Sequence, residues 1–442
     1  MKVAFVMQPI NLISLTDQHG SIEIITYELA RRLARNCDVI VYAKKGRYQK
    51  ESEYDQGVQY QRISVPLDEW PTAVSSALDK LERYPGMHAL SRGIRQFLFF
   101  RNVRHPFHAS RWFYRDYALK VAKTLQKENC DIVHIHNFSQ LVPIIRASNP
   151  KIKIVLHMHC EWLTQLDREM IESRLGQVDL IIGVSDFITK KIQCCFPEFA
   201  QRCRTLFNGV DVHTPRQEGK KGGECKKNGV TKLLTVGRVS PEKGVHILLD
   251  AYKHVLEHYP QSQLEIVGWI GTLPIEYLTT LSDDQLTLDL TKFYGGEQYI
   301  LHLQGKLSLI EKSHVSFLGE VPHRLMPNYY RDADVVVSAS VCNEPGNMPV
   351  IEAMAVGVPA VATRSGGTEE SVVDGETGLL VERGDASALA EAIIRLLSDE
   401  RLSNKMGKAA YRRAVELFSW EHAVEKLLKL YEEIGDAGGK SP

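Results

Sequence analysis

Residues 343–359 decide the fold, and they read Asn-Glu-Pro-Gly-Asn-Met-Pro-Val-Ile-Glu-Ala-Met-Ala-Val-Gly-Val-Pro. The apolar run Val335–Val337 just before them predicts a buried strand. A short helix is expected next, and Gly357 with Pro359 marks its end. A strand, a tight loop and a helix N-terminus predict an anion site, because free backbone N–H groups and the helix dipole point at the ligand.

Two carboxylates, Glu344 and Glu352, flank this predicted anion site. They would lie near a bound phosphate but not on it, since a carboxylate only accepts hydrogen bonds and repels an anion. Acceptor groups in this place suit neutral hydroxyls, such as those of a sugar and a ribose. The alternative is a surface helix that carries two solvated glutamates.

A second segment, Leu233–Gly244, predicts a strand followed by a loop with two cations, Arg238 and Lys243. The residues after it have the apolar spacing of an amphipathic helix. Arginine offers a planar fork for phosphate oxygens and lysine a compact charge, so the loop suits a diphosphate. Taken singly, each side chain could be an ordinary solvated charge.

Together the two segments resemble the retaining glycosyltransferases of family 4, which have the GT-B fold. Six further segments resemble this family in the same order along nearly the whole chain: Gly20–Glu23, Asp131–His136, Ile154–His159, Asn208–Asp211, Gly366–Glu370 and Gly375–Val381. Each of the six is a weak signal alone. Their order, combined with the glutamate pair, makes the resemblance specific.

Length and composition fit a soluble two-domain protein. The 442 residues are 44% hydrophobic and 24% charged, with a formal net charge of +0, so global charge favours neither nucleic acid nor membrane. The eight cysteines show no Cys-x-x-Cys spacing, which indicates free thiols in a reducing compartment. No apolar run is long enough to span a membrane, and the N-terminal run reads as a strand rather than a signal peptide. We therefore expect a cytoplasmic protein.

Two sets of alternating strands and helices predict an α/β protein with parallel sheets. The resemblance implies GT-B architecture, with two Rossmann-like, doubly wound domains that face each other across a cleft. We expect an acceptor-side domain in residues 1–212 and a Gly- and Lys-rich linker in 213–230. A nucleotide-sugar-binding domain is expected in 231–415. Residues 416–442 would form a helix that crosses back to the first domain, and a tail.

The resemblance implies transfer of a hexosyl-type sugar from a nucleotide diphosphate donor, with retention of the anomeric configuration. Arg238 and Lys243 would stabilise the departing diphosphate in place of a metal. Glu344 would contact the donor sugar, and covalent attack by Glu344 is the less favoured alternative. No cofactor and no metal are expected. The partners would be a UDP-, GDP- or ADP-sugar and a carbohydrate or lipid-linked acceptor in glycan, glycolipid or polysaccharide synthesis, with no nucleic acid.

Donor binding would involve five further positions. The backbone N–H groups of Gly346, Asn347 and Met348 would contact the phosphates, and Glu352 would contact the ribose hydroxyls. Gly20 would allow the backbone of the first domain to approach the donor. Family members often have two glycines there, whereas Ser21 follows Gly20 in this chain.

His159 ends a strand of the first domain, and the resemblance places it near the donor sugar as a catalytic residue. His134, His136 and His157 also end strands and are expected to be structural. We expect His157 and His159 to point to opposite faces of their strand, which disfavours a zinc site. The Asp332-Ala333-Asp334 motif resembles a metal-binding pair but fits the family's structural aspartate.

Two regions and one rival hypothesis complete the sequence interpretation. Residues 80–115 are basic and aromatic, which suits peripheral contact with anionic lipid on the inner face of a membrane, or a site for an anionic acceptor. The alternative is a helical pair with its arginines in water. Residues 269–312 form an insertion, and the sequence does not indicate its role. The rival is an inactive GT-B scaffold protein, and the presence of all four charged site residues argues against it.

Overall fold

The chain divides into two compact units. The computed structural model describes residues 1–70, 104–213, 230–279, 281–294 and 297–436, together with Pro215 and short pieces between residues 74 and 94. Unit 1 contains residues 1–184, 188–206 and those from Val424 onward, and unit 2 contains Ser185–Phe187 and Phe207–Ala423. The expected linker lies almost wholly outside the described residues, as does the tail after residue 436.

Unit 1 is built on an eight-stranded sheet with the order β3-β4-β2-β1-β5-β6-β7-β8. All neighbours are parallel except β3 and β4, which form an antiparallel edge pair. The strands are β1 (Lys2–Val6), β2 (Asp38–Lys44), β3 (Ser52–Asp55), β4 (Val58–Ile63), β5 (Ile132–His136), β6 (Lys153–Met158), β7 (Leu180–Gly183) and β8 (Cys203–Thr205). The central strands β1, β5 and β6 are almost fully buried because helices cover both faces of the sheet.

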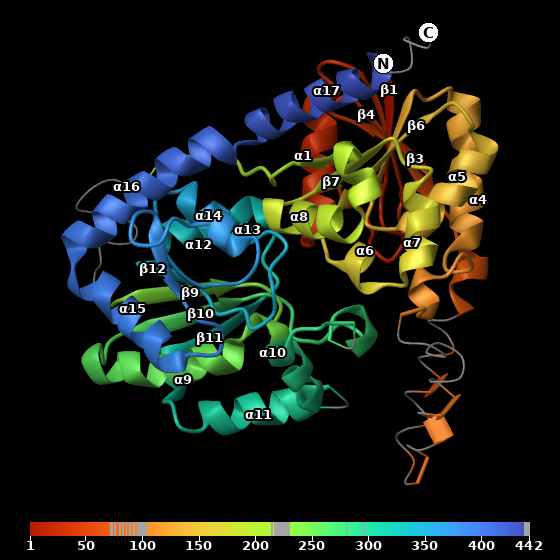
Figure 1. Cartoon of the computed structure of the whole chain (residues 1–442). Helices are drawn as coiled ribbons and strands as arrows, with labels where there is room; N and C mark the ends of the chain where they lie inside the picture. Colours follow the sequence, from red (N-terminus) through yellow and green to blue (C-terminus); the bar gives the residue numbers. More distant parts are fainter. Residues whose placement is uncertain are drawn as a thin grey trace. The chain divides into compact units, whose positions relative to one another are not determined.

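The helices of unit 1 are α1 (Ser21–Leu33), α4 (Arg115–Glu128), α5 (Val142–Ser148), α6 (Trp162–Gln165), α7 (Arg168–Leu175), α8 (Asp186–Cys195) and α17 (Trp420–Asp436). Figure 1 shows α1 and α17 on one face of the sheet and α4 and α5 on the other. Right-handed crossovers require this arrangement, because the chain runs one way from β1 to β2 and the opposite way from β4 to β7. Helix α17 therefore completes a layer that α1 alone leaves open.

Unit 2 is built on a six-stranded parallel sheet with the order β11-β10-β9-β12-β13-β14. The strands are β9 (Lys232–Val236), β10 (Gln263–Val267), β11 (Val315–Gly319), β12 (Val335–Ser338), β13 (Ala360–Thr363) and β14 (Gly378–Val381). The chain reverses direction between the neighbouring strands β9 and β12. In an open α/β sheet, ligands usually bind between the loops that follow the carboxyl ends of two such strands.

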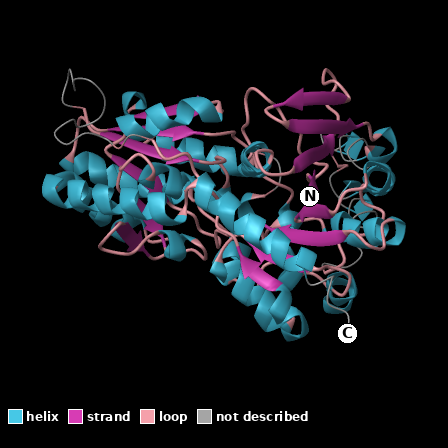
Figure 2. Ribbon diagram, turned by 90° about the horizontal axis from the view of Figure 1, so that it is seen from above, coloured by secondary structure: helices cyan, strands magenta, loops and turns pink. Residues whose placement is uncertain are grey.

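The helices of unit 2 form a layer on each face of its sheet (Figures 1 and 2). One layer contains α9 (Val245–His258), α11 (Gln298–Leu307) and α15 (Ala386–Ser398), which share one apolar core. The other contains α12 (Met326–Asp332), α13 (Met348–Met354) and α16 (Glu400–Leu417). Two further short helices are α10 (Gln285–Leu288) and α14 (Thr368–Ser371).

Ten strands are predicted from apolar runs, and all ten are present with end shifts of at most two residues. The predicted runs are Val3–Met7, Val39–Tyr42, Ile132–His136, Ile154–His159, Leu180–Val184, Lys232–Val236, Gln263–Val267, Val315–Leu318, Val335–Ser338 and Ala360–Thr363. Strands β3, β4, β8 and β14 were not predicted.

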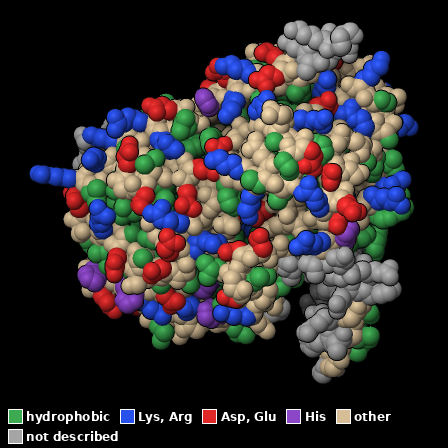
Figure 3. All heavy atoms as spheres, viewed as in Figure 1, with side chains coloured by type: hydrophobic (Ala, Val, Ile, Leu, Met, Phe, Trp, Pro, Cys, Tyr) green, Lys and Arg blue, Asp and Glu red, His purple; other side chains and the backbone are tan. Residues whose placement is uncertain are grey.

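Within the described parts of the chain, seven cysteines are free and no helix is long and apolar enough to cross a membrane. Figure 3 shows basic and acidic side chains interspersed over the visible face, as expected at zero net charge.

Candidate functional site

The loop between β9 and α9 holds its two cations through a tight glycine turn. Gly244 caps α9 with φ +67°, and a Cβ there would lie 1.8 Å from the carbonyl oxygen of Ala339. Only glycine fits, because the left-handed conformation is strained for other residues and the backbone of the next strand's loop is in contact. The turn therefore sets Lys243 against the loop that follows β12.

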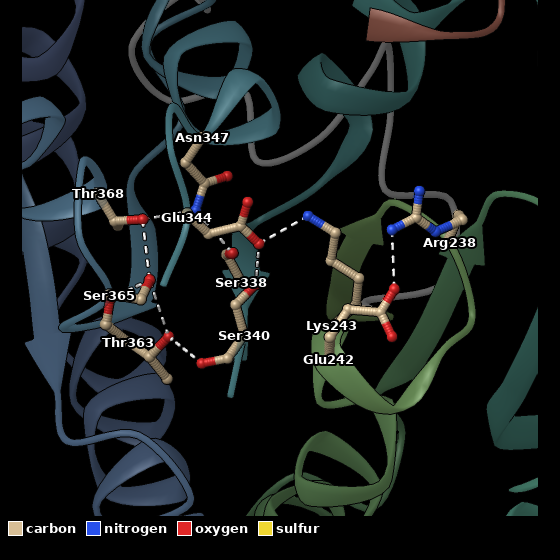
Figure 4. A network of polar contacts seen from close by, with 10 residues as sticks. All are labelled: Arg238, Glu242, Lys243, Ser338, Ser340, Glu344, Asn347, Thr363, Ser365 and Thr368. Carbon is tan, nitrogen blue, oxygen red and sulfur yellow. Dashed lines mark hydrogen bonds and ion pairs between the residues drawn. The ribbon is translucent and has the colours of Figure 1, made fainter. Parts of the chain in front are cut away.

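Lys243 forms an ion pair with Glu344, and its Nζ lies 2.6 Å from Glu344 Oε1 (Figure 4). Ser340 donates a second, short hydrogen bond to the same oxygen. Burial would lower the pKa of Lys243, but the Glu344 carboxylate outweighs it and the pKa is raised above its ordinary value. The lysine is therefore fully charged at neutral pH, and Glu344 is buried with its charge paired.

Arg238 pairs with Glu242 in the same loop, at 2.8 Å between Nη2 and Oε1 (Figure 4). Glu242 is almost fully buried, and its second oxygen accepts a hydrogen bond from the Tyr294 hydroxyl at 3.0 Å. Burial would raise the pKa of Glu242, but Arg238 and the hydrogen bonds to the carboxylate hold it below the ordinary value. Two cations and two carboxylates thus alternate along one edge of the sheet.

Asn347 anchors the loop at the start of α13. Its side-chain amide donates to the hydroxyls of Ser338 at 2.9 Å and Thr368 at 3.0 Å, and the residue is buried. Among the described hydrogen bonds, the N–H groups of Gly346, Asn347 and Met348 donate to no protein acceptor. A structured loop with free N–H groups beside two cations can bind an anion.

Glu352 lies in the second turn of α13, and both of its carboxylate oxygens are engaged. Tyr330 donates from its hydroxyl at 2.6 Å, and a ring nitrogen of His323 lies 2.8 Å from the other oxygen. Burial, and then the Glu352 charge, raises the pKa of Tyr330 well above its ordinary value, so the phenol keeps its proton. A carboxylate can accept about four hydrogen bonds, so Glu352 retains capacity for ligand hydroxyls.

Asp334 has a structural position. Its carboxylate accepts the backbone N–H of Lys232 at 2.9 Å, and its own N–H donates to the Lys232 carbonyl at 2.8 Å. These bonds join the starts of β9 and β12, far along the strands from the loops that hold Lys243 and Glu344. The structure therefore agrees with the structural interpretation of this aspartate.

Gly20 lies at the N-terminus of α1 in unit 1, with φ −91° and ψ 141°. This is an ordinary extended conformation, and a Cβ would meet nothing closer than 3.9 Å. The neighbouring loop is held by Glu23, which accepts hydrogen bonds from the backbone of Ser14 at 2.6 Å and His19 at 3.1 Å. The local fold does not require glycine at position 20, so any requirement would come from a ligand.

His159 follows β6 in unit 1, and its Nδ1 is buried. Nε2 lies 2.9 Å from Nδ1 of His136, and Nδ1 has no hydrogen-bond partner. The predicted opposite orientation of His157 and His159 is wrong, since their ring centroids are 4.0 Å apart. Residues two apart on a strand share a face. A sugar contact through a His159 nitrogen would require rotation of the ring.

Sequence reasoning missed four residues that hold the proposed ligand-binding side chains in place: Glu242, Tyr294, His323 and Tyr330. Glu242 lies between the two cations in sequence, and its spacing of four residues from Arg238 could have predicted their ion pair. Tyr294 comes from the 269–312 insertion, which forms short helical segments including α10 and α11. His323 and Tyr330 belong to the segment before β12, where no local pattern marks them.

Two family models match adjacent parts of the chain. Residues 22–214 match the model described as "Glycosyltransferase Family 4", and residues 218–413 match "Glycosyl transferases group 1". Spore coat protein SA of Bacillus subtilis is 30% identical over 331 residues, which cover 72% of this chain and 82% of that protein. D-inositol 3-phosphate glycosyltransferase of Corynebacterium jeikeium is 34% identical over 233 residues, covering 52% and 51%.

Solved structures show the same fold. Sucrose-phosphate synthase of Thermosynechococcus elongatus superposes with a TM-score of 0.69 at 21% identity, covering 99% of both chains. Anabaena HepE, solved in complex with UDP-glucose, gives a TM-score of 0.67 at 17% identity, covering 98% of this chain and 100% of that one. The predicted fold class, GT-B with two Rossmann-like domains, is confirmed.

Proposed function

Because this chain belongs to glycosyltransferase family 4 and is a glycosyltransferase with a nucleotide-sugar donor, we propose that it transfers a hexosyl-type sugar with retention of configuration. The acceptor would be a carbohydrate or a lipid-linked molecule in glycan or glycolipid synthesis. The observation that carries the proposal is the convergence of two cations and two carboxylates on neighbouring loops of unit 2, with Lys243 and Glu344 in contact.

Arg238 and Lys243 would bind the diphosphate of the donor. Each is paired with a carboxylate within hydrogen-bond distance, so both are held in place and charged before a ligand arrives. Pre-oriented charges stabilise a developing negative charge without reorganisation. The N–H groups of Gly346, Asn347 and Met348 would contribute to the same role. We propose that these groups supply the charge stabilisation at the diphosphate without a divalent metal ion.

The two glutamates would hold the neutral parts of the donor. Glu344 would accept hydroxyls of the sugar, and Glu352 those of the ribose, each through charge-assisted hydrogen bonds of roughly 1.5–3 kcal/mol. Tyr330 and His323 orient Glu352, which leaves its remaining lone pairs in fixed directions. From unit 1, we propose Gly20 and His159 as additional donor contacts.

In the proposed reaction, the bond between the anomeric carbon and the diphosphate oxygen breaks as the acceptor hydroxyl approaches on the leaving-group side. The acceptor oxygen forms the new glycosidic bond on that same face, so the configuration is retained. The acceptor's proton passes to the departing phosphate oxygen, and no protein base is required. Arg238 and Lys243 stabilise the leaving group throughout.

Peripheral membrane contact through residues 80–115 is part of the proposal, although much of this region lies outside the described residues. In its described part, the Trp112 side chain is exposed, and the Arg111 and Arg115 guanidinium carbons lie 5.0 Å from its ring centroid. An exposed indole flanked by arginines suits an anionic headgroup layer.

The proposal is tested by measuring thermal stability with UDP, GDP, ADP and their sugars. A ligand that binds only the folded state raises the melting temperature by mass action. UDP is the first candidate, because the HepE neighbour was solved with UDP-glucose. A shift with one base identifies the donor class, and proton NMR of the product from the matching sugar nucleotide then establishes its anomeric configuration.

A second candidate is a structural role without catalysis. The observation that favours it is the relative named spore coat protein SA. The paired site of unit 2 argues against it, since a scaffold gains nothing from two buried carboxylates held beside two cations. Absence of any nucleotide-dependent shift in a folded sample would favour the scaffold.

A further inference from the structure

Four histidines cluster on one face of the unit 1 sheet. His134 and His136 lie on β5, and His157 and His159 lie on or just after β6. His134, His136 and His157 have 0–1% of their surface exposed, beneath the layer that α17 completes. Ring centroids of successive neighbours lie between 4.0 and 5.6 Å apart.

Three ring nitrogens of the cluster have no hydrogen-bond partner. His134 uses both of its nitrogens, Nδ1 with the Tyr431 hydroxyl at 2.7 Å and Nε2 with His157 Nδ1 at 3.1 Å. His136 Nδ1 is bonded to His159 Nε2. The remaining atoms, His136 Nε2, His157 Nε2 and His159 Nδ1, are buried and have no partner.

No choice of tautomer satisfies these three atoms. A neutral imidazole has one N–H donor and one lone pair. If His136 and His157 carry their protons on Nδ1 and donate from there, their buried Nε2 lone pairs have no hydrogen-bond donor. If they accept at Nδ1 instead, both Nε2–H donors lack acceptors. Each buried unpaired group costs about 1–3 kcal/mol, so a bound species that pairs with His136 Nε2 and His157 Nε2 would stabilise unit 1.

We propose that His134, His136 and His157 form a binding site for one transition-metal ion of the zinc, cobalt, nickel and copper class. Their ligand atoms all lie within 4.8 Å of one another. Zinc–nitrogen bonds are about 2.0–2.1 Å long, so the rings would rotate to close the set around an ion. His134 Nε2 would then exchange its hydrogen bond with His157 Nδ1 for the metal. An all-imidazole set excludes magnesium and calcium, which require oxygen ligands.

The surroundings of the cluster fit metal ligation in two respects. Burial lowers the pKa of His136 to about 3 and those of His134 and His157 well below their ordinary value, so all three are in the neutral form that binds metals. Tyr431 on α17 bonds to His134 Nδ1 and would orient the ring, as second-layer groups do at histidine–metal sites.

The test uses the full chain without a histidine tag, freed of metal with a chelator and titrated with Co²⁺. We expect one Co²⁺ per chain by elemental analysis, and visible d–d absorption without a thiolate charge-transfer band, since the ligands are nitrogens and not the cysteines. The His136→Ala/His157→Ala variant should lose this binding. Tyr431→Phe should weaken it about 10–100-fold, as loss of an orienting group does.

The matched control is His254→Ala, which removes an exposed histidine from α9 and should bind Co²⁺ like the wild type. Absence of d–d absorption in the folded wild-type protein would overturn the proposal, whatever the variants do. Equal Co²⁺ binding by the His136→Ala/His157→Ala variant would overturn it as well, because the ion would then lie elsewhere. When the titration is repeated with zinc and followed by melting temperature, zinc should stabilise the wild type and His254→Ala but not the His136→Ala/His157→Ala variant.

Discussion

Lys243 and Glu344, which lie 101 residues apart in sequence, meet with 2.6 Å between Nζ and Oε1. The contact joins the loop after β9 to the loop after β12, two neighbouring strands between which the chain reverses direction. It brings together the two sequence segments that carry the family resemblance. The charge state and stability of this pair therefore report directly on the proposed donor site.

Replacing Glu344 with glutamine should destabilise the protein in a pH-dependent way. Removing one partner of a fully buried pair costs about 3–5 kcal/mol, and we expect less here because the Lys243 side chain is 29% exposed. The pKa of Lys243 is raised above 10.5, so the pair's contribution is complete below that pH and is lost as pH rises through the folded-state pKa.

The measurement is the melting temperature of the wild type and Glu344→Gln from neutral to alkaline pH. The difference between them should be largest near neutral pH and should shrink only as the pH rises past 10.5 toward the raised pKa of Lys243. Glu425→Gln, which breaks an exposed ion pair with Lys429, serves as the control and should change the melting temperature little. A pH-independent difference would contradict the assigned pairing.

Gly244→Ala should unfold the turn that presents Lys243. The φ of +67° costs an alanine about 1–2 kcal/mol, and the added Cβ would overlap the Ala339 carbonyl oxygen. We expect a clear loss of melting temperature and of nucleotide binding. Gly305→Ala is the matched control, since it lies within α11 with nothing within 4 Å and should be stabilising by about 0.5–1 kcal/mol. Equal melting temperatures for the two variants would refute this explanation of Gly244.

Glu352→Ala should raise the donor KM by 10-fold or more while turnover at saturation changes less, because it removes about one or two charge-assisted hydrogen bonds to the ribose. Tyr330→Phe keeps the carboxylate but removes one group that orients it, so we expect a smaller rise. Donor KM and melting temperature should be measured for both. A Glu352→Ala variant with wild-type donor affinity would remove the ribose assignment.

The fold was predictable where buried strands consist of runs of apolar residues. Central strands such as β1 and β12 contain continuous apolar runs, because both faces of a parallel sheet are covered. The edge strands escaped prediction, since β3 and β4 alternate polar residues and β8 has only three residues. Strand β14 lies in Gly375–Val381, which was identified only as a segment that resembles the family and not as a strand.

The site was predictable only in part. Arg238, Lys243, Glu344 and Glu352 stand out because charged residues in a strand–loop–helix segment have a known use at sheet edges. Tyr294 and His323 carry no local signal, since their role depends on which distant carboxylate they meet. The histidine cluster was misjudged for a different reason: the two-residue period of a strand was applied with the wrong parity to His157 and His159.

The Arg238→Ala/Lys243→Ala variant should lose turnover. Loss of one preorganised donor to a developing oxyanion costs about 10²–10³ in rate, and these two side chains would face the same diphosphate. Each substitution also leaves a buried carboxylate, Glu242 or Glu344, without its cation, so a lower melting temperature is expected. Transfer from the nucleotide sugar and the melting temperature should be measured on the same preparation.

Interpretation of this double variant depends on a charge-matched control. Lys429→Ala combined with Arg395→Ala also removes two cations, one from α17 and one from α15, and should retain wild-type turnover. Arg238→Lys keeps the charge but loses the planar fork that matches phosphate oxygens, so it should rank between the wild type and Arg238→Ala. A folded Arg238→Ala/Lys243→Ala protein with wild-type turnover would contradict the diphosphate role, since no other described cation lies in these two loops.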